Sequence, residues 1–190
     1  MKVGKIISMA AFLGGNAKLS KKIDGVISGG ETFTKEEKEE VEKYMKYYDI
    51  TVSELSQEYY PLTYKEDVKS ENGKFYYKDF KKTVLEIKAV YRSDIALKYR
   101  VYPEYFTCGE LSCTVEYVYL IDEAKSLDDD CVFDATPITG RVITEGVVAE
   151  ALVNDGMFEE AITWRDRYEK SLKTCLLRRR VKRLKARGWY

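Results

Sequence analysis

The sequence contains no histidine, and this absence removes several kinds of active site at once. Ser-His and Cys-His catalysis needs an imidazole to accept the proton of the nucleophile. The chain also has no GxxxxGK[ST] and no GxGxxG phosphate-binding loop. Paired carboxylates are the remaining catalytic alternative. Because the histidine-based sets and the phosphate-binding loops are absent, we expect a protein that is not an enzyme and that binds no cofactor.

Cysteine is scarce as well, with Cys108, Cys113, Cys131 and Cys175 as the only four. None of them forms a CxxC pair, and without histidine a zinc site would need cysteine or carboxylate ligands at unsuitable spacings. Cys108 and Cys113 flank a turn, so they are able to approach each other across a hairpin. We nevertheless expect four reduced thiols, as in an ordinary cytoplasmic protein.

Long hydrophobic runs are missing. The apolar stretch at residues 6–13 is broken by Ser8 and followed by Gly14 and Gly15, so it is not typical of a signal peptide. No segment approaches the roughly 20 apolar residues that a membrane span requires. The sequence predicts a protein that stays in the cytoplasm, or leaves it by a route other than secretion, and that has no membrane partner.

Charge is balanced overall but strongly segregated along the chain. Residues 1–30 carry a net charge of +4, residues 31–170 a net charge of −12, and residues 171–190 a net charge of +8. An acidic body with basic ends indicates that one end contacts an acidic partner, either nucleic acid or protein. The 16 tyrosines add material suited to strand faces and interfaces.

The first third of the chain has helical periodicity. Apolar residues three or four positions apart predict helices over residues 3–13 and 19–27, each followed by a pair of glycines. A longer helix is predicted over residues 35–60. It begins at a capping box formed by Thr34 and Glu37, and Pro61 ends it.

Residues 62–121 alternate between apolar and polar side chains, which predicts antiparallel strands. The alternation covers residues 85–92, 97–102 and 111–119. Asn72-Gly73 predicts a type I′ hairpin turn. The residues expected to be buried where the helices pack on this sheet are Tyr44, Tyr48, Leu55, Leu85, Ile87, Tyr99, Val115 and Tyr117.

Helical periodicity returns after Pro137 and predicts two closing helices, the first ending at residues 154–156 and the second running from Glu159 to about Arg187. The order indicates an α+β fold with N-terminal helices, a central antiparallel sheet and a C-terminal helix pair with a basic extension. We expect a single domain over residues 1–177, with helices in 1–60, the sheet in 62–121 and helices in 137–177. The basic extension covers residues 178–190.

An acidic cluster lies between the predicted sheet and the closing helices. Clustered oxygens suit Mg²⁺ or Ca²⁺, so a metal-dependent hydrolase is one alternative. The spacing is not that of an EF-hand, and neighbouring carboxylates in a loop usually form a solvated charge run. We therefore expect no metal site. The cluster consists of Asp122, Glu123, Asp128, Asp129, Asp130 and Asp134.

The C-terminal extension carries seven basic residues in ten positions and no acidic one. Cations near the end of a helix complement its dipole, but seven exceed what capping needs. The same charges would suit phosphate groups, because each contact releases counterions. The sequence therefore predicts a contact with DNA, with a neighbouring subunit or with another protein. The predicted contact residues are Arg178, Arg179, Arg180, Lys182, Arg183, Lys185 and Arg187.

Three segments together resemble a known group of proteins. They are VGKIISMAAFLGG at residues 3–15, TVSELSQEYYPL at residues 51–62, and GVVAEALVNDGMFEEAITWRDRYEKSL at residues 146–172. The last contains FEEA-x-x-W-x-x-R-(F/Y) and is similar to the closing helices of head–tail connector (adaptor) proteins from phages and prophages of Gram-positive hosts. The basic extension departs from this pattern.

This resemblance implies a structural virion protein that forms a homo-oligomeric ring in the phage neck against the portal or other neck and tail proteins. It implies no catalytic residues, and a location in the virion after assembly in the bacterial cytoplasm. The alternative is a nucleic-acid-binding module that acts through the basic C-terminal helix. The acidic body argues against a broad nucleic-acid footprint, which normally covers a basic face.

Overall fold

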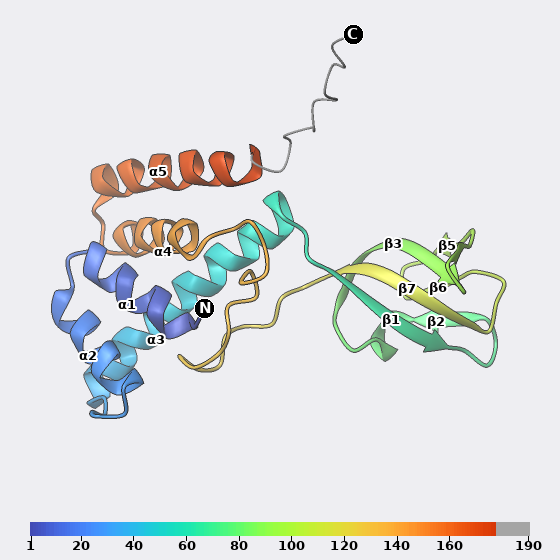
Figure 1. Ribbon diagram of the computed structural model, residues 1–190, viewed down its shortest axis with the longest axis horizontal. Helices are drawn as coiled ribbons and strands as arrows, with labels where there is room; N and C mark the ends of the chain where they lie inside the picture. Colours follow the sequence, from blue (N-terminus) through green and yellow to red (C-terminus); the bar gives the residue numbers. More distant parts are fainter. Residues whose placement is uncertain (178–190) are drawn as a thin grey trace, which may run out of the picture. The chain divides into compact units, whose positions relative to one another are not determined.

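The computed structural model describes residues 1–177, and the contacts among them divide the chain into two compact units (Figure 1). The helical unit contains residues 1–51 and 123–177, and the β unit contains residues 52–122. The α+β fold predicted from the sequence is confirmed. The single domain expected over residues 1–177 differs from this division, because each unit buries a hydrophobic core of its own.

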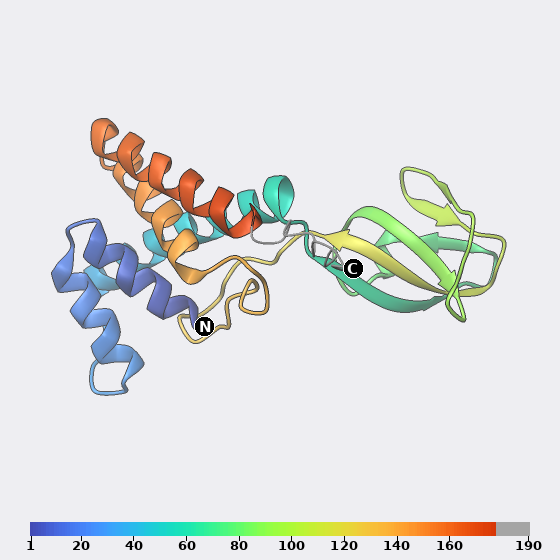
Figure 2. The ribbon, with the colours of Figure 1, turned by 45° about the horizontal axis from the view of Figure 1, so that its top comes forward.

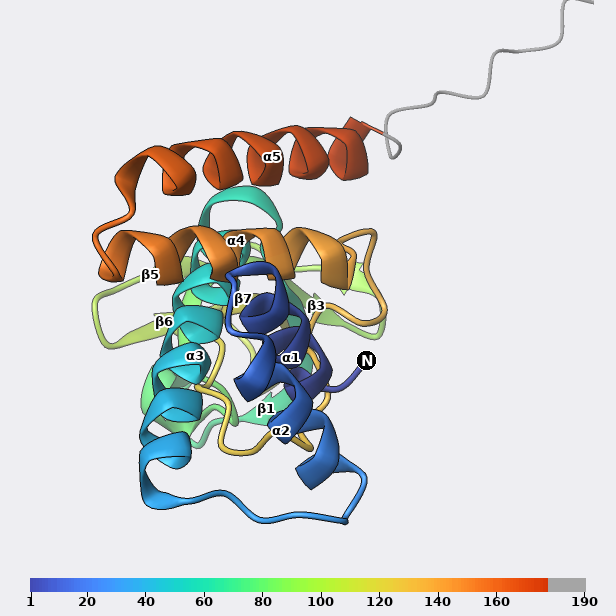
Figure 3. The same cartoon turned by 90° about the vertical axis from the view of Figure 1, so that its left-hand side faces the viewer.

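The helical unit is built from α1 (Val3–Leu13), α2 (Ala17–Ile27), all but the last three residues of α3 (Lys35–Glu54), α4 (Gly140–Asn154) and α5 (Phe158–Leu177). α1 contacts both α2 and α4, and α4 contacts α5, which lies alongside it (Figures 2 and 3). A short turn at Gly156, with φ of 76°, joins α4 to α5. Within residues 1–177, none of the helices combines the length and the apolar character needed to cross a membrane.

The signals that predicted these helices are visible in their hydrogen bonds. The backbone N–H of Thr34 donates to Glu37 Oε2 at 2.7 Å, and the N–H of Glu37 donates to Thr34 Oγ1 at 3.3 Å. This reciprocal pair is the predicted capping box, and it satisfies two amides that the helix leaves unpaired. After Glu54 the helix continues as a π-helix over Leu55–Tyr59, so the predicted end near residue 60 is confirmed.

The β unit contains two antiparallel sheets. The first has the strand order β1 (Thr63–Lys69), β7 (Ser112–Tyr119), β3 (Val84–Arg92) and β4 (Ile95–Ala96). The second has the order β2 (Lys74–Tyr76), β6 (Tyr105–Thr107) and β5 (Arg100–Val101). A short 3₁₀ helix, η2 (Tyr77–Asp79), follows β2.

The core of the β unit is made of its own side chains. Phe106 stacks on Phe75 with ring centroids 4.8 Å apart, and Phe80 meets Tyr117 edge to face at 5.1 Å. The Tyr117 hydroxyl donates to Glu66 Oε2 at 2.9 Å, and burial raises the pKa of this tyrosine. The sheet therefore fills its core with its own aromatic residues, where the sequence predicted helices to cover it. The buried members are Phe75, Ile87, Val90, Phe106, Cys113, Val115 and Tyr117.

Several predictions about the strands are wrong. The Asn72-Gly73 turn does not join paired strands, because β1 pairs with β7 and β2 pairs with β6. The strand predicted over residues 97–102 is reduced to the two residues of β5. Two register shifts in β3 change which of its side chains face the core, so that Leu85 is exposed and Val90 is buried.

The remaining core predictions hold in most cases. Tyr99 is only half-buried, and its hydroxyl donates to the carbonyl oxygen of Ile87 at 3.1 Å. The other six expected core residues are buried, namely Tyr44, Tyr48, Leu55, Ile87, Val115 and Tyr117.

Candidate interaction groove

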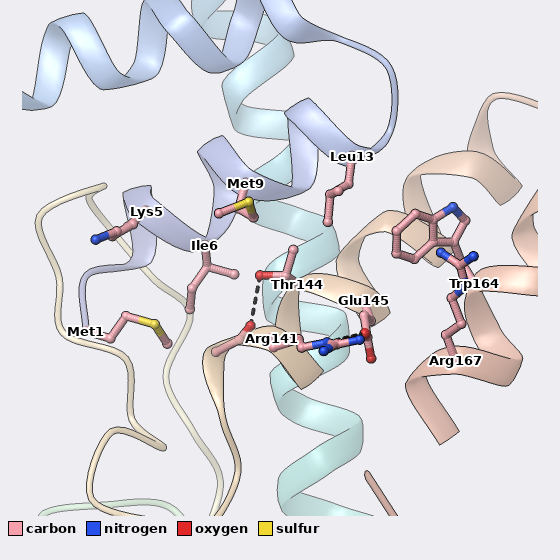
Figure 4. A pocket seen from close by; sticks show the side chains of 11 residues that line it. Met1, Lys5, Ile6, Met9, Leu13, Arg141, Thr144, Glu145, Trp164 and Arg167 are labelled. Atoms are coloured by element: carbon pink, nitrogen blue, oxygen red, sulfur yellow. Dashed lines mark hydrogen bonds and ion pairs between the residues drawn. The ribbon is translucent and has the colours of Figure 1, made fainter. Parts of the chain in front are cut away.

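The helical unit has an open groove of about 500 Å³ between α1, α4 and α5 (Figure 4). Met1 and Lys5 lie at one end of it, and Trp164 and Arg167 lie at the other. Most of the surface inside is apolar. The lining residues are Met1, Lys5, Ile6, Met9, Leu13, Gly140, Arg141, Thr144, Glu145, Trp164 and Arg167. We call this feature the α1–α4–α5 groove.

The apolar wall comes from an excess of hydrophobic residues on α1. Val3, Ile6 and Ile7 are buried in the helical unit, but Met9 is 49% exposed and Leu13 is 39% exposed. A helix that packs on one side needs only one apolar stripe. The second, exposed stripe therefore leaves apolar surface facing the solvent.

A buried carboxylate forms part of the groove lining. Glu145 on α4 is only 3% exposed, and its Oε1 accepts a hydrogen bond from Arg141 Nε at 2.8 Å. Its other oxygen, Oε2, is buried and has no hydrogen-bond partner among the described residues. A buried polar atom without a partner costs roughly 1–3 kcal/mol. The unpaired oxygen of Glu145 is therefore expected to lower the stability of the helical unit.

The rim of the groove is positively charged. Lys5 and Arg141 are exposed, and the guanidinium of Arg167 lies over the Trp164 ring at 4.8 Å from its centroid. The hydrogen bond with Glu145 raises the pKa of Arg141. The charge of Arg141 balances that of Glu145, so Lys5 and Arg167 are two further cations beside the apolar surface of the groove. This combination suits an apolar protein segment flanked by acidic residues.

Replacing Glu145 with methionine is expected to stabilise the free chain by about 1 kcal/mol, because the change removes a buried oxygen that lacks a donor and keeps the side-chain volume. Chemical denaturation followed by circular dichroism measures this difference. Glu150→Met is the matched control, since Glu150 is also on α4 and also accepts a hydrogen bond from an arginine, Arg165 at 3.2 Å, but its side chain is 26% exposed. Equal destabilisation by both changes would show that Glu145 is an ordinary ion-pair residue.

The contact residues predicted from the sequence all belong to the C-terminal extension. Arg178, Arg179, Arg180, Lys182, Arg183, Lys185 and Arg187 lie outside the described residues. The same holds for the last part of the helix predicted to reach about Arg187, since α5 is described to Leu177.

The acidic cluster helps to hold the start of α1. The N–H of Val3 donates to the carbonyl oxygen of Asp129 at 2.9 Å, and Lys2 pairs with Asp130 at 3.0 Å. The ammonium group of Met1 pairs with Asp134 at 2.6 Å. Over residues 1–177, no set of three carboxylate or thiol side chains is arranged to hold a metal ion.

The four cysteines are free thiols in the structure. Cys113 is buried, and Cys108 is half-buried beside it. Burial, together with the neighbouring Cys108, raises the pKa of the Cys113 thiol to about 12. Such a thiol is almost fully protonated at neutral pH and is therefore a poor nucleophile.

Sequence reasoning missed Glu145 and the groove around it. One local signal was present, because Glu145 stands between Ile143 and Val147 in a run that is otherwise apolar or small. An acid at such a position is either paired or exposed in most helices. The groove around it also includes residues of α1, which is distant in the sequence.

Comparisons with known proteins place the chain in no family. No family model matches it, and no curated protein matches it.

Proposed function

We propose that this protein is a structural subunit that works by binding other protein chains, as a connector-like (adaptor) ring subunit that joins head and tail in the neck of a tailed phage. The observation that carries the proposal is the α1–α4–α5 groove. It combines exposed apolar side chains, a rim of cations and a buried carboxylate oxygen without a donor. Exposed apolar side chains with a charged rim are properties of a surface that a second chain covers.

Two of the three segments that resemble connector proteins contribute residues to this groove. Residues 3–15 form α1 and the turn after it, and they supply Lys5, Met9 and Leu13 to the lining. The FEEA-x-x-W-x-x-R-(F/Y) segment begins α5, and its Trp and Arg are Trp164 and Arg167. The resemblance and the groove therefore support the same proposal through the same residues.

One observation favours a second candidate function. The seven basic residues between Arg178 and Arg187 have no acid among them, which suits the phosphate groups of DNA. In that case the protein would act as a nucleic-acid-binding module through its C-terminal extension.

The two functions differ in the expected molar mass of the full chain. For a ring subunit, light scattering after size-exclusion chromatography is expected to give a defined multiple of the monomer mass. Duplex DNA is expected to leave this value unchanged, and electron microscopy of the same fraction is expected to show closed rings. A monomer that binds DNA would support the second function, and a monomer that does not bind DNA would contradict both.

A further inference from the structure

A second exposed apolar surface lies where α4 ends and α5 begins. Val153 and Met157 are 48% and 45% exposed, and Phe158 and Ile162 are 62% and 65% exposed. These four residues, called here the α5 patch, come from the end of α4, the turn and the first turns of α5. Exposed phenylalanine and isoleucine together are unusual on a surface that stays in water.

The charges around the α5 patch are opposite to those around the groove. Asp155, Glu159 and Glu160 are exposed next to the patch, whereas Lys5 and Arg167 are exposed at the groove. One apolar surface thus has an acidic border, and the other has a basic border. Such complementarity favours association and disfavours contact of either surface with itself.

The two surfaces lie on opposite sides of α5. An α-helix turns by about 100° per residue, so Phe158 and Arg167 are about 180° apart around the axis. Ile162 and Trp164 are separated by about 200° on the same basis. Arg165 stands between Trp164 and Arg167 in the sequence, but its side chain points to the other flank of α5. There its Nη1 lies 3.2 Å from Glu150 Oε1. A chain is therefore unable to place its own α5 patch in its own groove.

We propose that the α5 patch of one copy of this chain docks in the α1–α4–α5 groove of a second copy. This inference rests on the proposed function and names the two surfaces that would join neighbouring subunits. The contact is heterologous, because each copy uses its groove on one side and its patch on the other. Repetition of such a contact produces a closed ring or an open filament.

The contact explains one feature that is unfavourable in the free chain, its exposed apolar surface. The exposed apolar residues of both surfaces become buried, which is the main driving force for association. Docking also excludes water from the apolar surface of the groove. The basic rim at Lys5 and Arg167 then meets Asp155, Glu159 and Glu160.

The test uses two variants that each remove one surface. Met9→Glu places an acid in the groove, and the double variant Phe158→Gln/Ile162→Gln removes the apolar side chains of the patch. All three positions are exposed, so the fold is expected to survive, which circular dichroism checks. The matched control is Ile50→Glu, an exposed apolar residue of α3 (51%) outside both surfaces.

Each variant alone is expected to associate at least tenfold more weakly than the wild type, because the apolar centre of an interface carries most of its affinity. A mixture of the two variants is expected to form a dimer of one copy of each and nothing larger. In that dimer the intact groove belongs to the patch variant, and the intact patch belongs to the groove variant. Native mass spectrometry identifies this species by its composition.

The outcomes separate this inference from the proposed function. A wild type that is monomeric contradicts both. A wild type that assembles, with both variants assembling equally well, contradicts only the docking of patch in groove. If Met9→Glu weakens assembly and the patch variant does not, then another segment, such as residues 178–190, fills the groove and the inference is wrong.

Discussion

Replacement of Phe106 with alanine is expected to destabilise the β unit by about 3 to 5 kcal/mol, the usual cost of removing a buried phenyl ring. Phe106 is fully buried. Its ring stacks on Phe75 at 4.8 Å and contacts Phe80 and Tyr99 at centroid distances of 6.3 and 6.4 Å. The cavity left by alanine would remove all three contacts.

Hydrogen exchange measured by mass spectrometry locates the effect of this change. Amides of β3 and β7 are expected to exchange faster, and amides of α1 and α4 are expected to keep their protection, because the Phe106 contacts lie within the β unit. Leu111→Ala is the control, since Leu111 is in the same unit but is 59% exposed. Equal loss of protection in the helices would show that the two units unfold as one.

The helices were predictable because their signals are local. The capping box at Thr34 and Glu37 and the turn glycine Gly156 act within a few residues of the helix ends. The predicted helices over residues 3–13 and 19–27 agree with α1 and α2 within two residues. Local hydrogen bonds and periodicity are sufficient for elements of this kind.

The sheets were less predictable because their pairing is not local. β1 pairs with β7, so that Thr63 lies opposite Val118. No turn residue signals a partner so far along the chain. The register shifts in β3 reverse the expected sides of Leu85 and Val90, and a β-bulge of this kind leaves little trace in an alternating pattern.

The groove depends on non-local packing in the same way. The sequence shows that α1 carries more apolar residues than one stripe requires. It does not show that Met9 and Leu13 stay exposed beside Trp164 on α5. The α5 patch was not predictable for the same reason, because the exposure of a helix face depends on whether another element packs against it.

Replacement of Gly146 with alanine is expected to destabilise the helical unit by about 1 to 3 kcal/mol, although alanine favours helices by about 1 kcal/mol over glycine. Gly146 lies inside α4, where α3 and α5 approach closely. A Cβ atom at this position would stand 2.5 Å from Thr51 Cγ2 and 3.2 Å from Tyr168 Cε2. The first distance is too short for two carbon atoms, and both neighbours are buried, so neither moves easily.

A second substitution tests whether this clash is the cause. Thr51→Ser removes the Cγ2 methyl group and keeps the hydroxyl, which donates to the carbonyl oxygen of Tyr47 at 2.9 Å. The double variant Gly146→Ala/Thr51→Ser is therefore expected to recover much of the lost stability, in a non-additive way that a double-mutant cycle measures.

Gly25→Ala is the matched control. Gly25 also lies inside a helix, α2, but the three atoms nearest to a Cβ there all belong to the side chain of Glu31. Glu31 is exposed and able to turn away, so the helix-forming advantage of alanine is expected to dominate and this variant to gain stability. If Gly146→Ala gained stability as well, then α3 and α5 would not approach α4 this closely, and the wall of the groove formed by Trp164 and Arg167 would be placed differently.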